Sequence, residues 1–245
     1  MRYADLVEVY EQLTGTTKRL EKTHILSEFL KKVPDADFDH ILLLVQGRVF
    51  PAWDERVIGM ASQSVVKAII LATGISQEKL ATVWKKTGDL GETAKQLTTH
   101  KKQATLFSQE LTTKKVFDNL RKLASMEGAG VVQNKLQLVA ELLTSATPIE
   151  AQYIIRTVLE DLRVGLGEGT IRDAIVWAFL LKGVTTYDQK KNEFTIPDEK
   201  KEEYDHCCAA VEDAINLTND FASVAKAAKH GIEKLGKITL NPKTP

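Results

Sequence analysis

The sequence has little of several residue types, and each shortage narrows what the chain can be. Its 245 residues include only two cysteines, six prolines and fourteen glycines. Adjacent cysteines rarely pair with each other and are too few for a structural zinc site, so Cys207 and Cys208 predict reduced thiols, one on a buried helix face, in a cytoplasmic protein. The shortage of proline and glycine, with almost no strand-like alternation, favours helices.

The chain also has no excess of charge of either sign. Thirty-three basic residues balance 33 acidic ones, so the formal net charge is zero. A DNA-binding domain usually carries a visible basic excess, and neutrality therefore argues against the simplest nucleic-acid interpretation. It leaves open a locally basic face, because phosphate contacts depend on local charge and on backbone amides.

Several functional patterns are missing from the sequence. No apolar run reaches the length of a membrane span, and the first residues lack the apolar core of a signal peptide, so no membrane partner is expected. There is no phosphate-binding Walker loop, no His/Cys metal spacing, no nucleophile elbow and no Lys-x-Asp-Gly nucleotidyl-transfer pattern. The sequence therefore predicts no catalytic residue and no metal site.

What is present is a glycine turn that occurs twice. The stretch from Ile58 to Ile69 is echoed without a gap by Val164 to Ile175, each with an apolar residue, a glycine, a short polar or small stretch and an apolar-periodic run. This pattern predicts a tight turn followed by a helix N-terminus. Such an end presents unpaired N–H groups and partial positive charge, which suits a phosphate.

The repeat extends upstream of the two turns. Leu26–Leu30 followed by Pro34 resembles Val139–Leu143 followed by Pro148, which gives repeat units of about 22–72 and 135–180. We expect an all-α, pseudo-two-fold duplicated domain of about twelve helices over residues 1–235, with 236–245 as a linker. The alternative is chance similarity between amphipathic helices.

Apolar spacing and capping residues predict most of these helices individually. Ser76 and Thr147 are expected N-caps, the latter within a capping box closed by Glu150, and a further helix is expected to begin near Thr112. Two stretches are expected to be irregular, residues 88–111 and the loop around 183–197. The remaining expected helices cover 3–13, 23–30, 38–45, 62–72, 136–143, 199–217 and 221–235.

The second glycine turn gives the sharpest local pattern. Gly165-Leu166-Gly167 followed by Gly169-Thr170 is similar to a helix-hairpin-helix, in which glycine lets the backbone approach a phosphate and Thr170 can cap or donate. The alternative is a plain helix–helix connection whose glycines serve packing. A helix-hairpin-helix glycosylase, with Asp188 as its carboxylate, and a non-catalytic helical adaptor are the rival functions.

Several segments together resemble the N-terminal DNA-binding domain of archaeal ATP-dependent DNA ligases. They occur in family order and are specific as a set. The matching stretches are Phe29–Pro34, Trp53–Arg56, Thr87–Glu92, Phe107–Gln109, Leu162–Gly165, Glu168 and Arg172–Ile175.

That resemblance implies a monomeric domain that holds nicked duplex DNA across the minor groove, independently of sequence, in replication, repair and recombination. The parent enzyme would use ATP and magnesium, whereas this stretch would bind no cofactor. Since the chain stops before the adenylation domain that the family carries, we expect it not to ligate alone. The residues implied in DNA binding are Lys22, Thr23, Gly59, Lys135, Arg163, Gly165, Gly167, Gly169 and Thr170.

The resemblance also implies a binding segment for the sliding clamp PCNA, at residues 103–107. Gln103 would make polar contacts while Leu106 and Phe107 fill an apolar pocket on the clamp. The alternative is an ordinary loop whose two apolar side chains pack in the core.

The chain departs from the family pattern at three places. Val131-Val132 stands where small polar residues are usual, Asn134 replaces an expected lysine, and Glu110 stands where proline is common. The first two departures weaken the DNA contact expected near Lys135.

Overall fold

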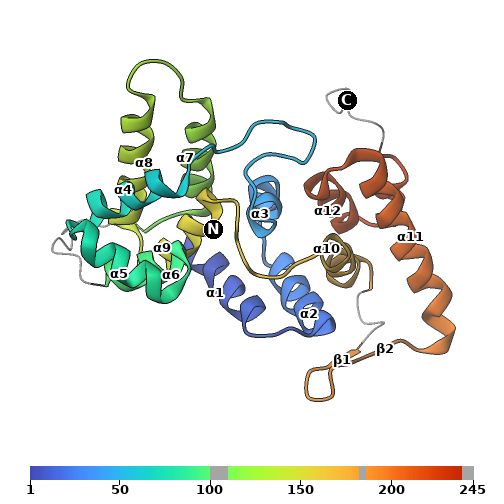
Figure 1. The fold of residues 1–245 in the computed structure, drawn as a ribbon. Helices are drawn as coiled ribbons and strands as arrows, with labels where there is room; N and C mark the ends of the chain where they lie inside the picture. Colours follow the sequence, from blue (N-terminus) through green and yellow to red (C-terminus); the bar gives the residue numbers. More distant parts are fainter. Residues whose placement is uncertain (100–109, 182–185, 239–245) are drawn as a thin grey trace. The chain divides into compact units, whose positions relative to one another are not determined.

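The fold is all-α, as the sequence predicts. The computed structural model describes residues 1–99, 110–181 and 186–238, and in these it contains thirteen α-helices and one two-stranded hairpin (Figure 1). The helices are α1 Tyr3–Thr14, α2 Arg19–Leu30, α3 Phe38–Val45, α4 Ser62–Thr73, α5 Gln77–Thr87, α6 Leu90–Thr98, α7 Thr113–Ser125, α8 Val131–Ser145, α9 Pro148–Val158, α10 Glu168–Ile175, α11 Lys201–Thr218, α12 Phe221–Lys229 and α13 Ile232–Leu235.

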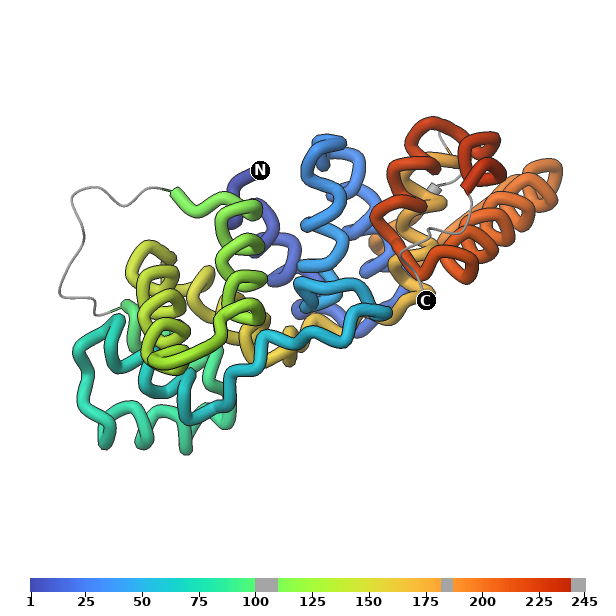
Figure 2. The backbone as a smooth tube through the Cα atoms, turned by 90° about the horizontal axis from the view of Figure 1, so that it is seen from above, coloured from blue at the N-terminus to red at the C-terminus, as the bar shows by residue number. Residues whose placement is uncertain are grey.

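The chain forms two compact units, and each unit is assembled from distant stretches of sequence. Unit 1 comprises Met1–Val7, Leu44–Phe50 and Arg56–Arg163, and in it α4 packs on α8 and α6 packs on α9. Unit 2 comprises Glu8–Leu43, Pro51–Glu55 and Val164–Pro245. There α2 packs on α10, and α11 and α12 lie beside α10 (Figure 2).

Each unit therefore pairs one helix from each proposed copy. In unit 1, α4 belongs to the first copy and α8 to the second, whereas in unit 2, α2 belongs to the first and α10 to the second. The boundaries of the repeat units, and their action as one domain over residues 1–235, stay predictions.

Local capping explains why several helices begin where the sequence predicts. The Thr147 hydroxyl accepts from the Glu150 amide while the Glu150 carboxylate accepts from the Thr147 amide, so both halves of the capping box are present. Ser76 and Thr112 cap α5 and α7 through their hydroxyls alone, which accept from the amides of Lys79 and Lys115. These starts depend on neighbours in sequence, which is why they could be predicted.

Two expected irregular stretches contain regular structure. The region 88–111 was expected to be less regular, with a turn over residues 88–91, but α6 forms there because the Asp89 carboxylate caps it, accepting from the Gly91 and Glu92 amides. The expected loop around 183–197 contains an antiparallel hairpin of β1, Thr186–Asp188, and β2, Glu193–Thr195. The Trp177 and Phe194 rings stack with centroids 4.0 Å apart, which holds β2 against the body of unit 2.

The expected helix at 221–235 is interrupted. It is divided into α12 and α13 by Gly231, whose φ of +103° does not fit a right-handed helix. Elsewhere, α2 and α8 begin four and five residues earlier than expected, at Arg19 and Val131. The longer helices bring Lys22 and Lys135 fully inside regular structure.

The α6–α9 contact in unit 1 is close because Gly91 has no side chain. A Cβ at Gly91 would lie 2.7 Å from Arg156 Cγ and 2.8 Å from the Gln152 carbonyl oxygen, both on α9. The second glycine of the Thr87–Glu92 stretch is therefore required by packing between the two helices. None of the described helices is both long and apolar enough to span a bilayer.

We predict that Gly91→Ala lowers the free energy of unfolding by about 1–3 kcal/mol, because the added methyl group forces α6 and α9 apart. Gly236→Ala is the matched control, since its nearest neighbour would be 3.9 Å away and its φ is −65°; it should cost less than about 0.5 kcal/mol. Urea denaturation followed by circular dichroism measures both. Equal stabilities would show that the two helices can separate without cost.

Candidate nucleic-acid interface

The second glycine turn is held from behind by a lysine on α2. Gly165 is exposed and adopts a φ of +62°, while Val164 beside it is buried. The Lys22 ammonium donates to the Val164 carbonyl at 2.7 Å and to the Gly165 carbonyl at 2.9 Å. Lys22 is only 8% exposed, so its charge lies beneath the turn.

The first glycine turn repeats this arrangement in the other unit. Gly59 is exposed with a φ of +65°, and Ile58 before it is buried. The Lys135 ammonium, on α8, donates to the Ile58 carbonyl at 3.2 Å, and the Ile58 amide donates to Glu160 Oε1 at 3.1 Å. Lys135 is related to Gly59 as Lys22 is related to Gly165, so the two turns share one construction.

Peptide geometry fixes where the amides of these turns point. All described peptide bonds are trans, and in a trans peptide the C=O and the following N–H point in opposite directions. Because Lys22 binds the carbonyls of Val164 and Gly165, the N–H groups of Gly165 and Leu166 point away from it; Lys135 orients the Gly59 N–H likewise. Among the described residues these three amides donate no hydrogen bond.

The electrostatics of both turns favour an anion. Neither lysine has a carboxylate within ion-pair distance among the described residues, and burial lowers the pKa of Lys22. Free amide donors on one side of each turn, with a lysine ammonium on the carbonyl side, favour an anion over a cation. This arrangement can hold a phosphate without touching a base.

The start of α10 adds an open position beside the second turn. Gly167 is the N-cap of α10 with a φ of −98°, and a Cβ there would meet nothing within 4 Å. A Cβ at Gly169 would lie 3.3 Å from Arg19 Nη2, and the Thr170 side chain is buried. Of the expected glycines, Gly167 therefore presents the least obstructed backbone.

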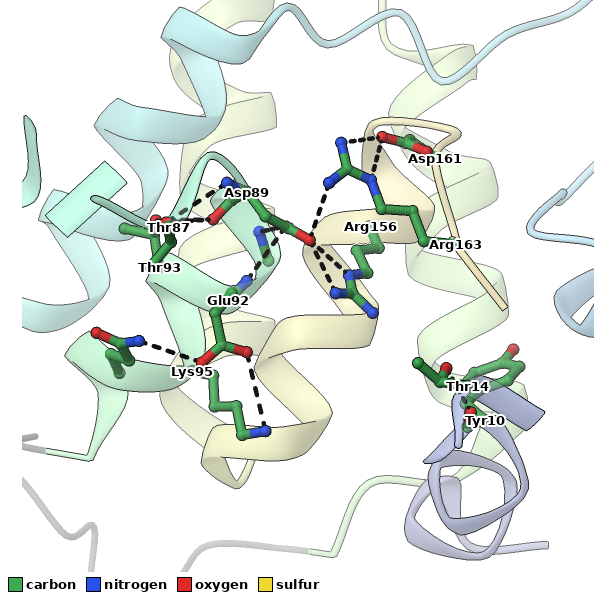
Figure 3. A network of polar contacts seen from close by, with 12 residues as sticks. Tyr10, Thr14, Thr87, Asp89, Glu92, Thr93, Lys95, Arg156, Asp161 and Arg163 are labelled. Carbon is green, nitrogen blue, oxygen red and sulfur yellow. Dashed lines mark hydrogen bonds and ion pairs between the residues drawn. The ribbon is translucent and has the colours of Figure 1, made fainter. Parts of the chain in front are cut away.

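Arg163, just before the turn, belongs to an ion-pair network in unit 1 (Figure 3). Asp89 Oδ2 accepts from Arg156 Nε and Nη2 at 3.1 and 2.8 Å and from Arg163 Nη1 at 3.3 Å. Arg163 also pairs with Asp161 at 2.6 Å. Its φ of +60° is uncommon for a residue with a side chain. The 48%-exposed Arg163 guanidinium can exchange these carboxylates for a phosphate.

Asp89 links the helix cap to the arginines. Burial raises the pKa of the Asp89 carboxyl, but hydrogen bonds from Arg156 and from the amides of Glu92 and Gly91 outweigh it, so the net pKa lies below the ordinary value. The sequence pattern at Thr87–Glu92 pointed to a turn and a family match. The binding of Arg156 and Arg163 by Asp89 could not be predicted in this way, because both arginines are distant from Asp89 in sequence.

The structure places the other expected residues as follows. Thr23 is 1% exposed and its hydroxyl donates to the Arg19 carbonyl, so that side chain serves its own helix. Direct DNA contacts by all of the expected residues stay predictions. The expected clamp segment, with Gln103, Leu106 and Phe107, lies outside the described residues.

Sequence reasoning missed two residues that support the site. Arg19 pairs with Asp173 on α10 at 2.7 Å, and Glu160 holds the first turn from a left-handed conformation of φ +56°. Arg19 was visible only as part of a basic cluster at 18–22, which is typical of a solvated helix face. No local pattern identifies Glu160, because its partner is 102 residues away.

Two further expectations concern catalysis. Asp188, the carboxylate of the glycosylase alternative, accepts from the Lys190 and Lys191 amides and so forms the turn of the β1–β2 hairpin. Within the described residues no group of three His, Cys, Asp or Glu side chains could hold a metal ion. Both cysteines are free thiols, and one of them, Cys207, is buried on a helix while Cys208 is partly buried, as the sequence predicts.

Comparison with known proteins identifies the family of the chain. The family described as DNA ligase N terminus matches residues 2–176. The chain belongs to this family. The DNA ligase of Methanothermobacter thermautotrophicus is 40% identical over 244 aligned positions, which cover 99% of this chain and 39% of that protein. Those of Methanobrevibacter smithii and Thermococcus fumicolans are 38% and 37% identical and cover the whole chain and 40% of each relative. The chain thus spans about two fifths of the length of the curated relatives it matches.

We predict that Asp89→Asn lowers the free energy of unfolding at pH 7 by on the order of 3 kcal/mol, because it leaves Arg156 buried without its counter-charge. Since the folded pKa of Asp89 is lowered, its stabilisation exists above the ordinary carboxyl pKa of about 4 and is lost as the pH falls through the folded value. The difference between wild type and variant should therefore shrink on acidification.

Asp118→Asn is the matched control for this prediction. Asp118 pairs with Lys114 at 2.7 Å on the exposed face of α7, where such a pair contributes less than about 0.5 kcal/mol. Urea titrations at pH 7 and at about pH 3 compare the variants. A difference for Asp89→Asn that stays constant with pH would mean that the pairing with arginine does not stabilise the fold.

Proposed function

We propose that this chain is a sequence-independent DNA-binding domain of an ATP-dependent DNA ligase, which holds nicked duplex DNA by its sugar–phosphate backbone. The observation that carries the proposal is the paired construction of the two glycine turns. Each has an outward amide without a partner among the described residues and a lysine ammonium behind its carbonyls. Membership of the DNA ligase N terminus family supports the same role.

The chemistry of the turns explains why such binding would be independent of sequence. Backbone amides and a buried ammonium recognise phosphate, which is the same at every nucleotide, and carry no pattern that matches base edges. Arg163 would add one direct charged contact at the second turn. Contact across the minor groove, as the resemblance implies, suits a surface of backbone donors.

In the parent enzyme, ATP would transfer AMP to an enzyme lysine and then to the 5′-phosphate at the nick, and the 3′-hydroxyl would displace it. ATP and magnesium would act in the catalytic parts of that enzyme. This chain would contribute affinity and alignment, because fixing the two DNA ends lowers the entropic cost of the sealing step.

Clamp binding through Gln103, Leu106 and Phe107 is a separate expectation. A double variant with Leu106→Ala and Phe107→Ala tests it, and we expect this variant to be lost from a clamp pull-down.

We predict that the chain binds duplex DNA with an affinity that falls steeply between about 50 and 200 mM salt, and that Gly167→Val weakens this binding about tenfold or more. The backbone of Gly167 is extended and a Cβ there would meet no protein atom within 4 Å, so we expect the free energy of unfolding to change by less than about 1 kcal/mol. Its side chain would instead occupy the space where the DNA backbone approaches.

Fluorescence anisotropy with a labelled nicked duplex measures the affinity, and Gly236→Val is the control for a bulky side chain at a glycine that belongs to neither turn. Equal losses of binding and stability at Gly167 would favour a purely structural role for the glycine. A wild-type affinity that does not respond to salt would reject phosphate binding and favour the adaptor function. Release of a damaged base by the chain would favour the glycosylase.

A further inference from the structure

The two turns are built alike, but the side chains around them are chemically different. The gapless match of residues 58–69 with 164–175 puts Val57 opposite Arg163, each immediately before its turn. The equivalent contacts of Lys135 and Lys22 put Val132 opposite Arg19, each three residues before its lysine. Two arginines at one turn are therefore replaced by two valines at the other.

The valines are exposed to an unusual degree. Val57 and Val132 are each 58% exposed, and only four large hydrophobic side chains within the described ranges 1–99, 110–181 and 186–238 are classed as exposed. The other two are Leu71 and Leu217. Half of this set thus belongs to the segments that build a single turn in unit 1.

Both valines belong to the segments that build the first turn. Val57 Cγ2 is 3.9 Å from the point where a Cβ on Gly59 would lie. Val132 is one helical turn before Lys135 on the same face of α8, the face that reaches the Ile58 carbonyl. The first turn therefore has one exposed valine next to Gly59 and a second on the helix face that supports the turn.

The backbone of DNA offers two kinds of surface to such a site. One is the charged phosphate oxygens, and the other is the carbon-rich face of deoxyribose, which lines the minor groove. An arginine next to a free amide suits phosphate, whereas a valine loses nothing by covering sugar carbons and gains by leaving water. Apolar side chains are used at minor-groove surfaces for this reason.

We propose that the first turn binds DNA mainly through deoxyribose, with Val57 and Val132 packed on sugar carbons around a single Gly59–phosphate hydrogen bond, while the second turn binds mainly through phosphate. The inference rests on the proposed function and divides it between the two turns. It also gives a role to Val132, which stands where the family resemblance leads one to expect a small polar residue.

The test uses three variants. The first combines Val57→Ser and Val132→Ser, the second is Arg163→Gln, and the third is Leu217→Ser on α11, the control for an exposed apolar side chain. Each is titrated with labelled nicked duplex over a range of KCl concentrations. The valine variant should lose about 5- to 20-fold in affinity at every salt concentration, with an unchanged slope of log affinity against log salt. Arg163→Gln should reduce that slope by about 1, and Leu217→Ser should change neither quantity.

The outcomes separate this inference from the proposed function. If the wild type binds with steep salt dependence but the valine variant binds equally well, the inference is wrong, and the valines are left as a surface for a protein. If the wild type does not bind DNA, the proposed function itself fails. Thermal unfolding checks each variant, and Val57→Ala with Val132→Ala provides a milder form should serine disturb the fold.

Discussion

Both candidate binding turns depend on one interaction, the hydrogen bond from a lysine ammonium to a backbone carbonyl of the other copy. Lys22 reaches Val164 across 142 residues of sequence, and Lys135 reaches Ile58 across 77. At the second turn there are two reasons why position 165 is a glycine. Gly165 has a left-handed φ, and a Cβ there would lie 2.7 Å from Lys22 Nζ, so a side chain would both strain the backbone and displace the ammonium.

The same hydrogen bond also determines which ends of the peptide groups face the surface. A buried ammonium without a carboxylate is unfavourable by itself, and the lowered pKa of Lys22 reflects that cost. Its hydrogen bonds orient the peptide groups so that their N–H ends face outward, and a bound phosphate would complete the arrangement from the other side. Zero net charge is therefore compatible with a strong local preference for an anion.

The part of the fold that could be predicted is the part that depends on neighbours in sequence. Thr147 and Glu150 cap each other within one helical turn, and apolar spacing located α3 and α4 closely. The helix α6 was missed although its cap, Asp89, is local, because Gly88 and Gly91 were interpreted as a turn. The glycine turns were found because they repeat, but the burial of Lys22 and Thr23 was not foreseen, since it depends on α10 packing against α2.

The pairing of helices from different copies has a consequence for biosynthesis. On a translating ribosome, α2 emerges long before α10, and the partner that Lys22 binds is 142 residues further along the chain. Until then the apolar face of α2 lacks the helix that covers it in the native unit. Such long-range contacts form slowly, and the exposed apolar surface favours aggregation of the unfinished chain. Division of the gene between the two copies would separate α2 from α10 and α4 from α8, so we expect each product to be poorly folded until both are expressed together.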